Sequence, residues 1–309
     1  GISLTSIIQA AVKDPTEVNT FVKRLEEQKK ERNMENRTLV TPYRNDVELQ
    51  LFGLQRSGNH AVTAWILQQF SSATVFLNNV AHFEDPFLHF RVGTVEGMVP
   101  VNKRNLAQLE HLRAQEKPLL IYSYENLKLS HLRQRPLVPD RKNMLGASRH
   151  IRRVLLCRDF FNWAASRIRL MEYRKQDISS TVADFNPMID LWLSYAREFV
   201  GDTDHLGTDG VVRISYPRWV NDPEYRAYLL GRMDLPLHDN SNGKVPDVGG
   251  GSSFDKITFS GSATTMKTDE RWHYLLDDRF GPIRAIIQSR RAEIEEYNGR
   301  AFDMDWPRI

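Results

Sequence analysis

The sequence predicts an α/β fold in which a parallel sheet of about five strands is flanked by helices. Two observations lead to this prediction. Between residues 47 and 215 the chain contains five short apolar runs rich in Val, Ile and Leu, and segments with helical spacing lie between them. Such runs are typical of strands that are buried on both faces. Strands that alternate with helices form parallel sheets.

The expected elements follow one another in a regular order. The runs expected to form strands are residues 47–54, 73–77, 118–122, 151–157 and 210–215. The clearest helical patterns fall at residues 61–70 and 160–171. Ligands of such sheets bind at the carboxyl ends of the strands, so the strand-to-helix turns are where a functional site is expected.

Residues 1–44 are expected to form a helical N-terminal extension, and residues 45–309 the main domain. Apolar residues recur at spacings of three and four through residues 7–25, which is a helical pattern. The charged stretch at residues 26–37 is expected to be a solvated helical face rather than a binding patch.

Composition and charge limit the function classes. With 309 residues, 41% hydrophobic and 26% charged, the chain is an ordinary globular sequence, which excludes disordered and fibrous classes. The net charge is +3 with both signs interspersed, so no nucleic-acid partner is expected. No apolar run approaches the roughly 18 residues of a membrane span. The single cysteine, Cys157, excludes a disulfide framework, and we expect a cytoplasmic protein of undetermined oligomeric state.

The turn after the first expected strand is the most informative motif. Residues 53–60 read Gly-Leu-Gln-Arg-Ser-Gly-Asn-His and open a helix, so backbone N–H groups there can bind a phosphate. The two glycines have the spacing of a nucleoside-triphosphate loop, but Asn59 and His60 replace its Lys and Ser/Thr. The turn therefore lacks the usual magnesium ligand, which disfavours ATP hydrolysis. Arg56 still supplies a permanent positive charge. Taken alone, the turn could simply connect a strand to a helix.

This turn resembles the 5′-phosphosulfate loop of the sulfotransferases that use 3′-phosphoadenosine 5′-phosphosulfate (PAPS), which have a P-loop NTPase-like architecture. The resemblance implies that Arg56 contacts the bridging oxygen of the donor. It also implies that the following residues wrap the 5′-phosphate, namely Ser57, Gly58, Asn59, His60 and Ala61. The cytosolic members carry two threonines where this chain has Asn59 and His60, so the polar side-chain contacts differ here.

A second match is independent of the first. In the family a strand ends in an Arg that is followed eight residues later by a Ser on the next helix, and the two bind the 3′-phosphate. In this chain Arg158 follows the run 154–157 and Ser166 lies eight positions on. Because a helix rises about 1.5 Å per residue, the two side chains can converge on one phosphate. Read without the family, Arg158 could instead form an ion pair with Asp159.

Two weaker matches complete the resemblance. Tyr216 follows the last expected strand, where the family has a Tyr that contacts adenine; alternatively, it is an aromatic residue that completes the core. In the family an Arg-Lys-Gly loop before a tryptophan closes on the 3′-phosphate. Here Lys267 lies at the same distance before Trp272 as the glycine of that loop, and residues 250–254 could supply the flexible part of the loop.

The resemblance implies transfer of a sulfuryl group from PAPS to a hydroxyl or amine of a glycan or small-molecule acceptor. The product of the donor is adenosine 3′,5′-bisphosphate (PAP), and no metal is expected. Arg56 is the expected donor to the leaving oxygen, where negative charge builds up, and His60 is near enough in sequence to assist.

The acceptor must lose a proton, which requires a base. The family has this base just after the second strand in its glycan-sulfating branch and at the end of the third strand in its small-molecule branch. The resemblance therefore implies His82 or Glu125 as the base, and we favour His82. Residues 78–99, 176–186 and 240–262 are expected to line the acceptor site.

Two other function classes stay open. A kinase-like protein with the same fold would bind ATP or GTP with magnesium, and Glu125 or Asp159 would then be candidate metal ligands. A non-catalytic nucleotide-binding module is the third reading. Dependence of activity on magnesium separates the first of these from a sulfotransferase.

Overall fold

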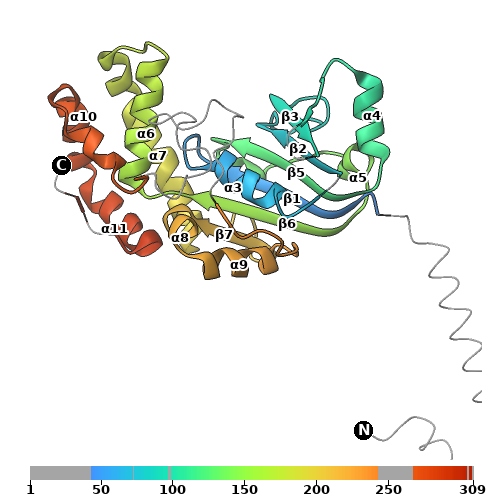
Figure 1. The fold of residues 1–309 in the computed structure, drawn as a ribbon. Helices are drawn as coiled ribbons and strands as arrows, with labels where there is room; N and C mark the ends of the chain where they lie inside the picture. The colour runs from blue at the N-terminus through green and yellow to red at the C-terminus, as the bar shows by residue number, and fades with distance from the viewer. Residues whose placement is uncertain (1–42, 72, 97–98, 243–266, 305, 308–309) are drawn as a thin grey trace, which may run out of the picture. The chain divides into compact units, whose positions relative to one another are not determined.

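The structure is a computed structural model that describes residues 43–71, 73–96, 99–242, 267–304, 306 and 307 (Figure 1). The expected helical N-terminal extension lies outside the described residues, except for its last two positions. Residues 250–254, which were expected to supply the flexible part of a loop, and most of the expected acceptor segment 240–262 also lie outside them. No helix among the described residues is long and apolar enough to cross a lipid bilayer.

A single sheet of seven strands forms the centre of the described domain, in the order β4-β3-β2-β5-β1-β6-β7. Five of these strands run parallel and occupy the positions predicted from the apolar runs. They are β1 (Asn45–Gly53), β2 (Thr74–Asn78), β5 (Lys117–Glu125), β6 (Ser148–Cys157) and β7 (Val211–Ser215). The α/β fold class with a largely parallel sheet is therefore confirmed.

The expected number of about five strands is too low, because the sheet continues beyond β2 as a short antiparallel extension. This edge consists of β3 (Val92–Val95) and β4 (Val99–Pro100). β3 pairs antiparallel with β2, and β4 pairs antiparallel with β3. The two strands have four and two residues, and three of those six positions are exposed. Without a continuous apolar run, they are not distinguishable from loop in the sequence.

Helices cover both faces of the sheet (Figure 1). Leu49 and Leu51 on β1 face a core shared with Trp65, and Phe52 faces the opposite core shared with Trp163. The helices on the first face are α3 (Asn59–Leu67), α8 (Tyr216–Asn221) and α9 (Pro223–Arg232). Those on the second face are α4 (Leu106–Ala114), α6 (Phe160–Tyr173) and α7 (Ile178–Val200). The segments α10 (Gly281–Ser289) and α11 (Arg291–Phe302) pack against α7.

Residues 176–186 were expected to be a loop that lines the acceptor site, and the expectation of a loop is wrong for most of that segment, whereas its contact with an acceptor stays a prediction. Helix α7 begins at Ile178, and the side chain of Asp177 caps it by accepting a hydrogen bond from the N–H of Ser180 at 2.8 Å. Phe185 and Ile189, four positions apart, are fully buried in the core of the second face. This segment is therefore held in place by packing and by a capped helix start.

The strand order places the ends of four strands at one edge of the sheet. From β1 the chain crosses to β2 on the far side of β5, whereas β6 lies on the other side of β1. In the register, Gly53 of β1 is paired with both Glu125 of β5 and Leu156 of β6. The segments after β1, β5 and β6 therefore meet at the point where the strand order reverses, which is where ligands bind in open α/β sheets.

Candidate functional site

The turn between β1 and α3 requires glycine at both of its expected positions. A Cβ atom on Gly53 would lie 2.0 Å from Oδ1 of Asn59, so no side chain fits there. Gly58 has φ +99°, and a Cβ atom on it would lie 2.1 Å from Cε2 of Tyr216. Left-handed backbone favours glycine, and here the aromatic ring adds a second constraint. Tyr216 therefore packs directly against the turn.

Gly58→Ala is expected to lower the free energy of unfolding by about 2 to 5 kcal/mol, from about 1 to 2 of left-handed strain and about 1 to 3 of overpacking against Tyr216. Gly201→Ala is the matched control, because Gly201 has φ +87° with nothing within 4 Å of a Cβ atom. The control should lose only the part of the free energy of unfolding that comes from left-handed strain, about 1 to 2 kcal/mol. Urea unfolding of both variants measures the difference, and equal losses would show that the Tyr216 ring yields freely.

Side chains from β5 and α6 anchor the turn. The N–H of Gln55 donates to Oδ1 of Asn126 at 2.9 Å, and the Gln55 carbonyl accepts from Nε1 of Trp163 at 3.1 Å. The Gln55 side chain accepts from Nη1 of Arg167. These contacts hold the turn from outside. The first hydrogen bond within α3 runs from the N–H of Val62 to the Gly58 carbonyl. The N–H groups that precede Val62 in the first turn therefore have no partner within the helix and are available to an anion.

Asn59 and His60 have different surroundings. The Asn59 side-chain amide donates to the Leu54 carbonyl at 3.1 Å and to Oε1 of Glu125 at 3.3 Å. Burial is the main cause that lowers the pKa of His60, partly opposed by Glu125 and reinforced by Arg56. His60 is therefore neutral at pH 7, so it would donate or accept a hydrogen bond rather than act as a cation.

Arg158 and Ser166 lie together, as the eight-residue spacing predicts. Arg158 is 3% exposed, and its Nη1 lies 3.4 Å from both Oγ of Ser166 and the Arg56 carbonyl. Its Nη2 donates to the Thr268 carbonyl at 2.6 Å. Asp159 does not pair with Arg158 but caps α6, accepting from the N–H of Asn162 at 3.0 Å. The alternative of an Arg158–Asp159 ion pair is therefore not what the structure contains.

Tyr216 reaches this site through the sheet register. Cys157 of β6 pairs with Ser215 of β7, so Arg158 and Tyr216 follow paired positions. The Cζ atom of Arg158 lies 5.0 Å from the centre of the Tyr216 ring, and that ring also stacks on Trp219 at 5.6 Å. Tyr216 is 8% exposed and joins the core to the turn. Contact of Tyr216 with an adenine stays a prediction.

The segment that begins at Lys267 lies beside Arg158. Thr268 supplies the carbonyl that Arg158 contacts, and the N–H of Trp272 donates to Oδ1 of Asn162 on α6 at 3.0 Å. The Lys267 side chain is exposed and forms an ion pair with Glu270 at 2.9 Å. The segment therefore covers the Arg158 side of the site, while a contact of Lys267 with a ligand stays a prediction.

Three guanidinium groups at this site have unused hydrogen-bonding capacity. Within the described part of the chain, the buried Nε atoms of Arg56, Arg158 and Arg167 have no hydrogen-bond partner. Burial and the neighbouring Arg158 lower the pKa of Arg56, and burial beside Arg174 lowers that of Arg167 to about 10. The Glu125 carboxylate is near Arg56 and Arg167, but the unused N–H groups of these buried guanidinium groups indicate a site that takes an anion.

Ser57 adds an unused hydroxyl to this group. It is fully buried, and its Oγ has no hydrogen-bond partner among the described residues. The carboxylate that acts electrostatically on both Arg56 and Arg167 is that of Glu125. The donor set of buried guanidinium groups and a hydroxyl fits a ligand that carries more than one phosphate or sulfate group.

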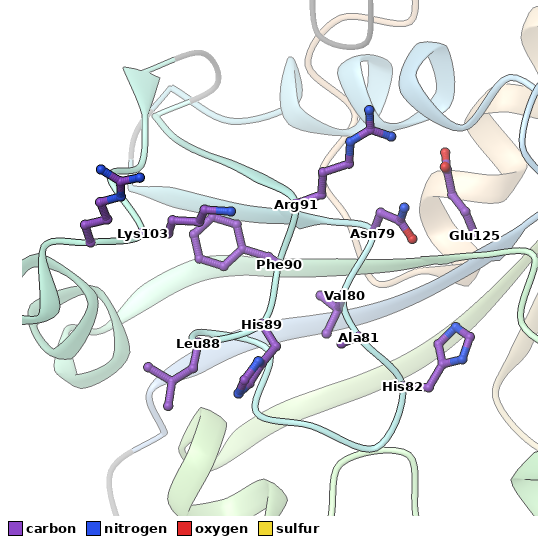
Figure 2. A pocket seen from close by; sticks show the side chains of 11 residues that line it. Asn79, Val80, Ala81, His82, Leu88, His89, Phe90, Arg91, Lys103 and Glu125 are labelled. Carbon is purple, nitrogen blue, oxygen red and sulfur yellow. The ribbon is translucent and has the colours of Figure 1, made fainter. Parts of the chain in front are cut away.

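A cleft of about 710 Å³ borders this site and contains both base candidates (Figure 2). Glu125 lines it at the end next to the turn, as its contact with Asn59 indicates. His82 also lines the cleft, but its ring is exposed and packs 6.1 Å from Tyr124. Burial of one side, with His131 nearby, lowers the pKa of His82. The geometry brings Glu125, rather than the favoured His82, into contact with the turn.

Residues 79–91, which form one wall of the cleft, leave and rejoin the sheet at neighbouring points. The N–H of Arg91 donates to the Asn78 carbonyl at 2.9 Å, and the N–H of Ala81 donates to the His89 carbonyl at 2.8 Å. Inside the loop, Asp85 forms an ion pair with Arg113 of α4 at 2.8 Å. The two hydrogen bonds form a narrow neck at the base of the loop. Together with the ion pair to α4, this neck holds the cleft wall in place.

Several residues of the site were not recognised from the sequence. Arg167 directly follows Ser166, and its position one residue from a predicted ligand is a signal that could have identified it. Asn126 directly follows Glu125 and has φ +58°, which Asn tolerates better than most residues. The basic residues Arg91, Lys103 and Arg104 line the cleft from the segments that come directly before β3 and after β4, and no motif marks them.

The candidate metal ligands of the kinase-like alternative are engaged in other contacts. The Asp159 carboxylate is buried and caps α6, and Glu125 accepts from Asn59. Among the described residues, no group of three or more His, Cys, Asp or Glu side chains is placed to hold a metal ion.

Comparison with known proteins gives a likeness to solved structures but no match by sequence. No protein-family model matches the chain, and no curated protein matches it by sequence. Among solved structures, mouse sulfotransferase SULT7A1 complexed with PAP is similar over 80% of this chain and 84% of that chain. The sequence identity is 11% and the TM-score is 0.43. At these values the function has to be argued from the residues of this chain.

Proposed function

We propose that this chain is a sulfotransferase that moves a sulfuryl group from PAPS to a hydroxyl or amine of a glycan or small-molecule acceptor. The observation that supports this most directly is the convergence of Arg158 and Ser166, with Nη1 and Oγ 3.4 Å apart, beside the turn that carries Arg56. Two anionic groups of one ligand can be bound there, one by the turn and the other by the Arg158–Ser166 pair. A cytoplasmic location and the absence of a metal requirement are part of this proposal.

Each residue then has a defined role. Bound PAPS supplies the sulfuryl group and the phosphate that leaves. Arg56 donates to the oxygen on which negative charge builds, and the first turn of α3 holds the 5′-phosphate. Glu125 accepts the proton of the acceptor hydroxyl. The acceptor oxygen forms a new bond to sulfur while the bond from sulfur to the phosphate oxygen breaks.

A kinase-like function is less well supported. Asn59 points its amide at Leu54 and Glu125, where a nucleoside-triphosphate loop has the lysine that contacts the terminal phosphates. Asp159 is engaged as a helix cap. Neither residue is free to perform the chemistry that a magnesium nucleotide requires.

The test is calorimetric titration of PAP and of adenosine 5′-phosphate, which lacks the 3′-phosphate, in the presence of a chelator. Wild-type chain should bind PAP more tightly. Arg158→Ala should weaken PAP binding about ten- to a hundredfold, because a charge-assisted hydrogen bond contributes roughly 1.5 to 3 kcal/mol. It should leave adenosine 5′-phosphate binding nearly unchanged.

Arg213→Ala is the matched control, because Arg213 is a partly buried strand arginine that donates to the Glu198 carbonyl at 3.2 Å. It should change neither affinity. Equal losses for both ligands in Arg158→Ala would make Arg158 a structural residue. Magnesium-dependent ATP binding tighter than PAP binding would favour the kinase-like alternative.

A further inference from the structure

The cleft beside the turn is strongly basic on the side away from Glu125. Arg91, Lys103 and Arg104 line it, and Glu125 is the carboxylate among its lining residues. In Figure 2 the side chain of Lys103 lies at the opposite side of the cleft from Glu125, and Arg91 lies between them. The cleft therefore has an acidic end at the turn and a basic end away from it.

The three cations are not neutralised within the described part of the chain. The side chains of Arg91, Lys103 and Arg104 form no hydrogen bond and no ion pair with any residue that the structure describes. Arg113 in the same region behaves differently, because its guanidinium is paired with Asp85 at 2.8 Å.

The acidic groups near the cleft do not offset this charge. Oε1 of Glu125 accepts from Asn59 at the turn. Glu84 lies within the same loop and pairs with His89 at 3.9 Å. The basic end of the cleft therefore carries an excess of positive charge, and a concave surface on which one sign predominates attracts ligands of the opposite sign.

We propose that the acceptor carries an oxyanion, such as a carboxylate or a sulfate, which Lys103 and Arg104 bind together with Arg91. The acceptor hydroxyl would then lie at the Glu125 end, next to the turn. The identification of this ligand as the acceptor rests on the proposed sulfotransferase function, whereas the anion site itself rests on the cleft. The substrate class is therefore an acidic hydroxyl compound rather than a neutral phenol or alcohol.

The experiment is a titration of PAP-saturated chain with D-glucuronate and D-glucose 6-sulfate, with D-glucose as the neutral counterpart. Because PAP fills the anion site at the turn, the remaining anion site is the cleft. The ring resonances of His82 and His89, which line the cleft, report occupancy by NMR. Both acids should shift these resonances in a saturable way, increasingly weakly as salt rises, and D-glucose should not.

Lys103→Ala/Arg104→Ala should weaken binding of both acids about two- to thirtyfold, since two exposed ion pairs are worth roughly 0.2 to 1 kcal/mol each. Both residues are exposed, so the variant should fold normally. Lys142→Ala/Arg232→Ala makes the same change in charge at exposed positions outside the cleft lining and should not alter the affinity. Unchanged affinity in the first variant, or equal binding of D-glucose, would overturn the proposal.

Failure of the donor assignment gives a different result. If PAP does not bind, the proposed function is wrong, and the sugar acids are then titrated into the free chain. Loss of their binding in Lys103→Ala/Arg104→Ala would still support an anion site in the cleft, and no effect would overturn it.

Discussion

Arg56→Gly is expected to lower the turnover of sulfuryl transfer by about 10²- to 10³-fold while the chain stays folded. The loss has the size seen when one donor to a developing oxyanion is removed. Arg56 has φ +76°, and its guanidinium is partly desolvated beside Arg158. Both features oppose folding of the free chain. Arg56, proposed to donate to the leaving oxygen, is therefore a residue whose conformation and burial both cost the fold free energy.

Arg56→Ala is the matched variant that separates function from stability. It removes the same guanidinium but keeps a Cβ atom at a left-handed position. We expect it to lose the same activity and to be less stable than Arg56→Gly by about 1 kcal/mol, because left-handed backbone costs an L-residue roughly that much. Activity is measured with labelled PAPS and stability by urea unfolding. Near-normal turnover in both variants would remove Arg56 from the reaction.

Glu125→Gln is expected to lower turnover by about 10²- to 10⁴-fold, the range of general-base catalysis, with little change in PAP affinity. Glutamine can still accept the hydrogen bond from Asn59, so the turn should keep its geometry. Glu84→Gln is the control, because Glu84 is an exposed carboxylate in the same loop as His82. It should retain activity.

His82→Ala should reduce turnover less than tenfold if Glu125 is the base, a bound set by the lower limit of general-base effects, about 10². The pH dependence gives a second discriminator. Because the pKa of His82 is lowered from its ordinary value of 6.5, a His82 base would lose activity only as the pH falls below that value. An inactive His82→Ala with an active Glu125→Gln would restore the preference for His82 that the sequence suggested.

The central strands were predictable because burial on both faces leaves a continuous apolar signal. Val154, Leu155 and Leu156 are all fully buried, and the run they form marks β6 without ambiguity. The edge strands β3 and β4 lack this signal because they are short and three of their six positions, including both in β4, are exposed. Helix α7 was partly missed because Pro187 lies within it and because its polar first turn resembles a loop.

The site was predictable only where one local segment contains both partners. Arg158 and Ser166 lie eight residues apart on one strand–helix unit, so their convergence follows from helix geometry. The contacts of Arg158 with Thr268 and of Arg167 with Gln55 join segments more than a hundred residues apart. Such contacts depend on how helices pack on the sheet, which no local spacing encodes.

The narrow neck of residues 79–91 allows the two halves of the site to diversify separately. The half proposed to bind the donor is built on β1, β5 and β6. A shift of one residue in the register of these strands would turn every side chain to the opposite face of the sheet. The cleft wall is attached through hydrogen bonds at Asn78 and Arg91. Doubling the length of a flexible loop costs only about 0.6 kcal/mol in closure entropy. If the chain is the sulfotransferase proposed above, insertions or exchanges between these anchors change which acceptor binds, while the residues proposed to bind the donor keep their positions.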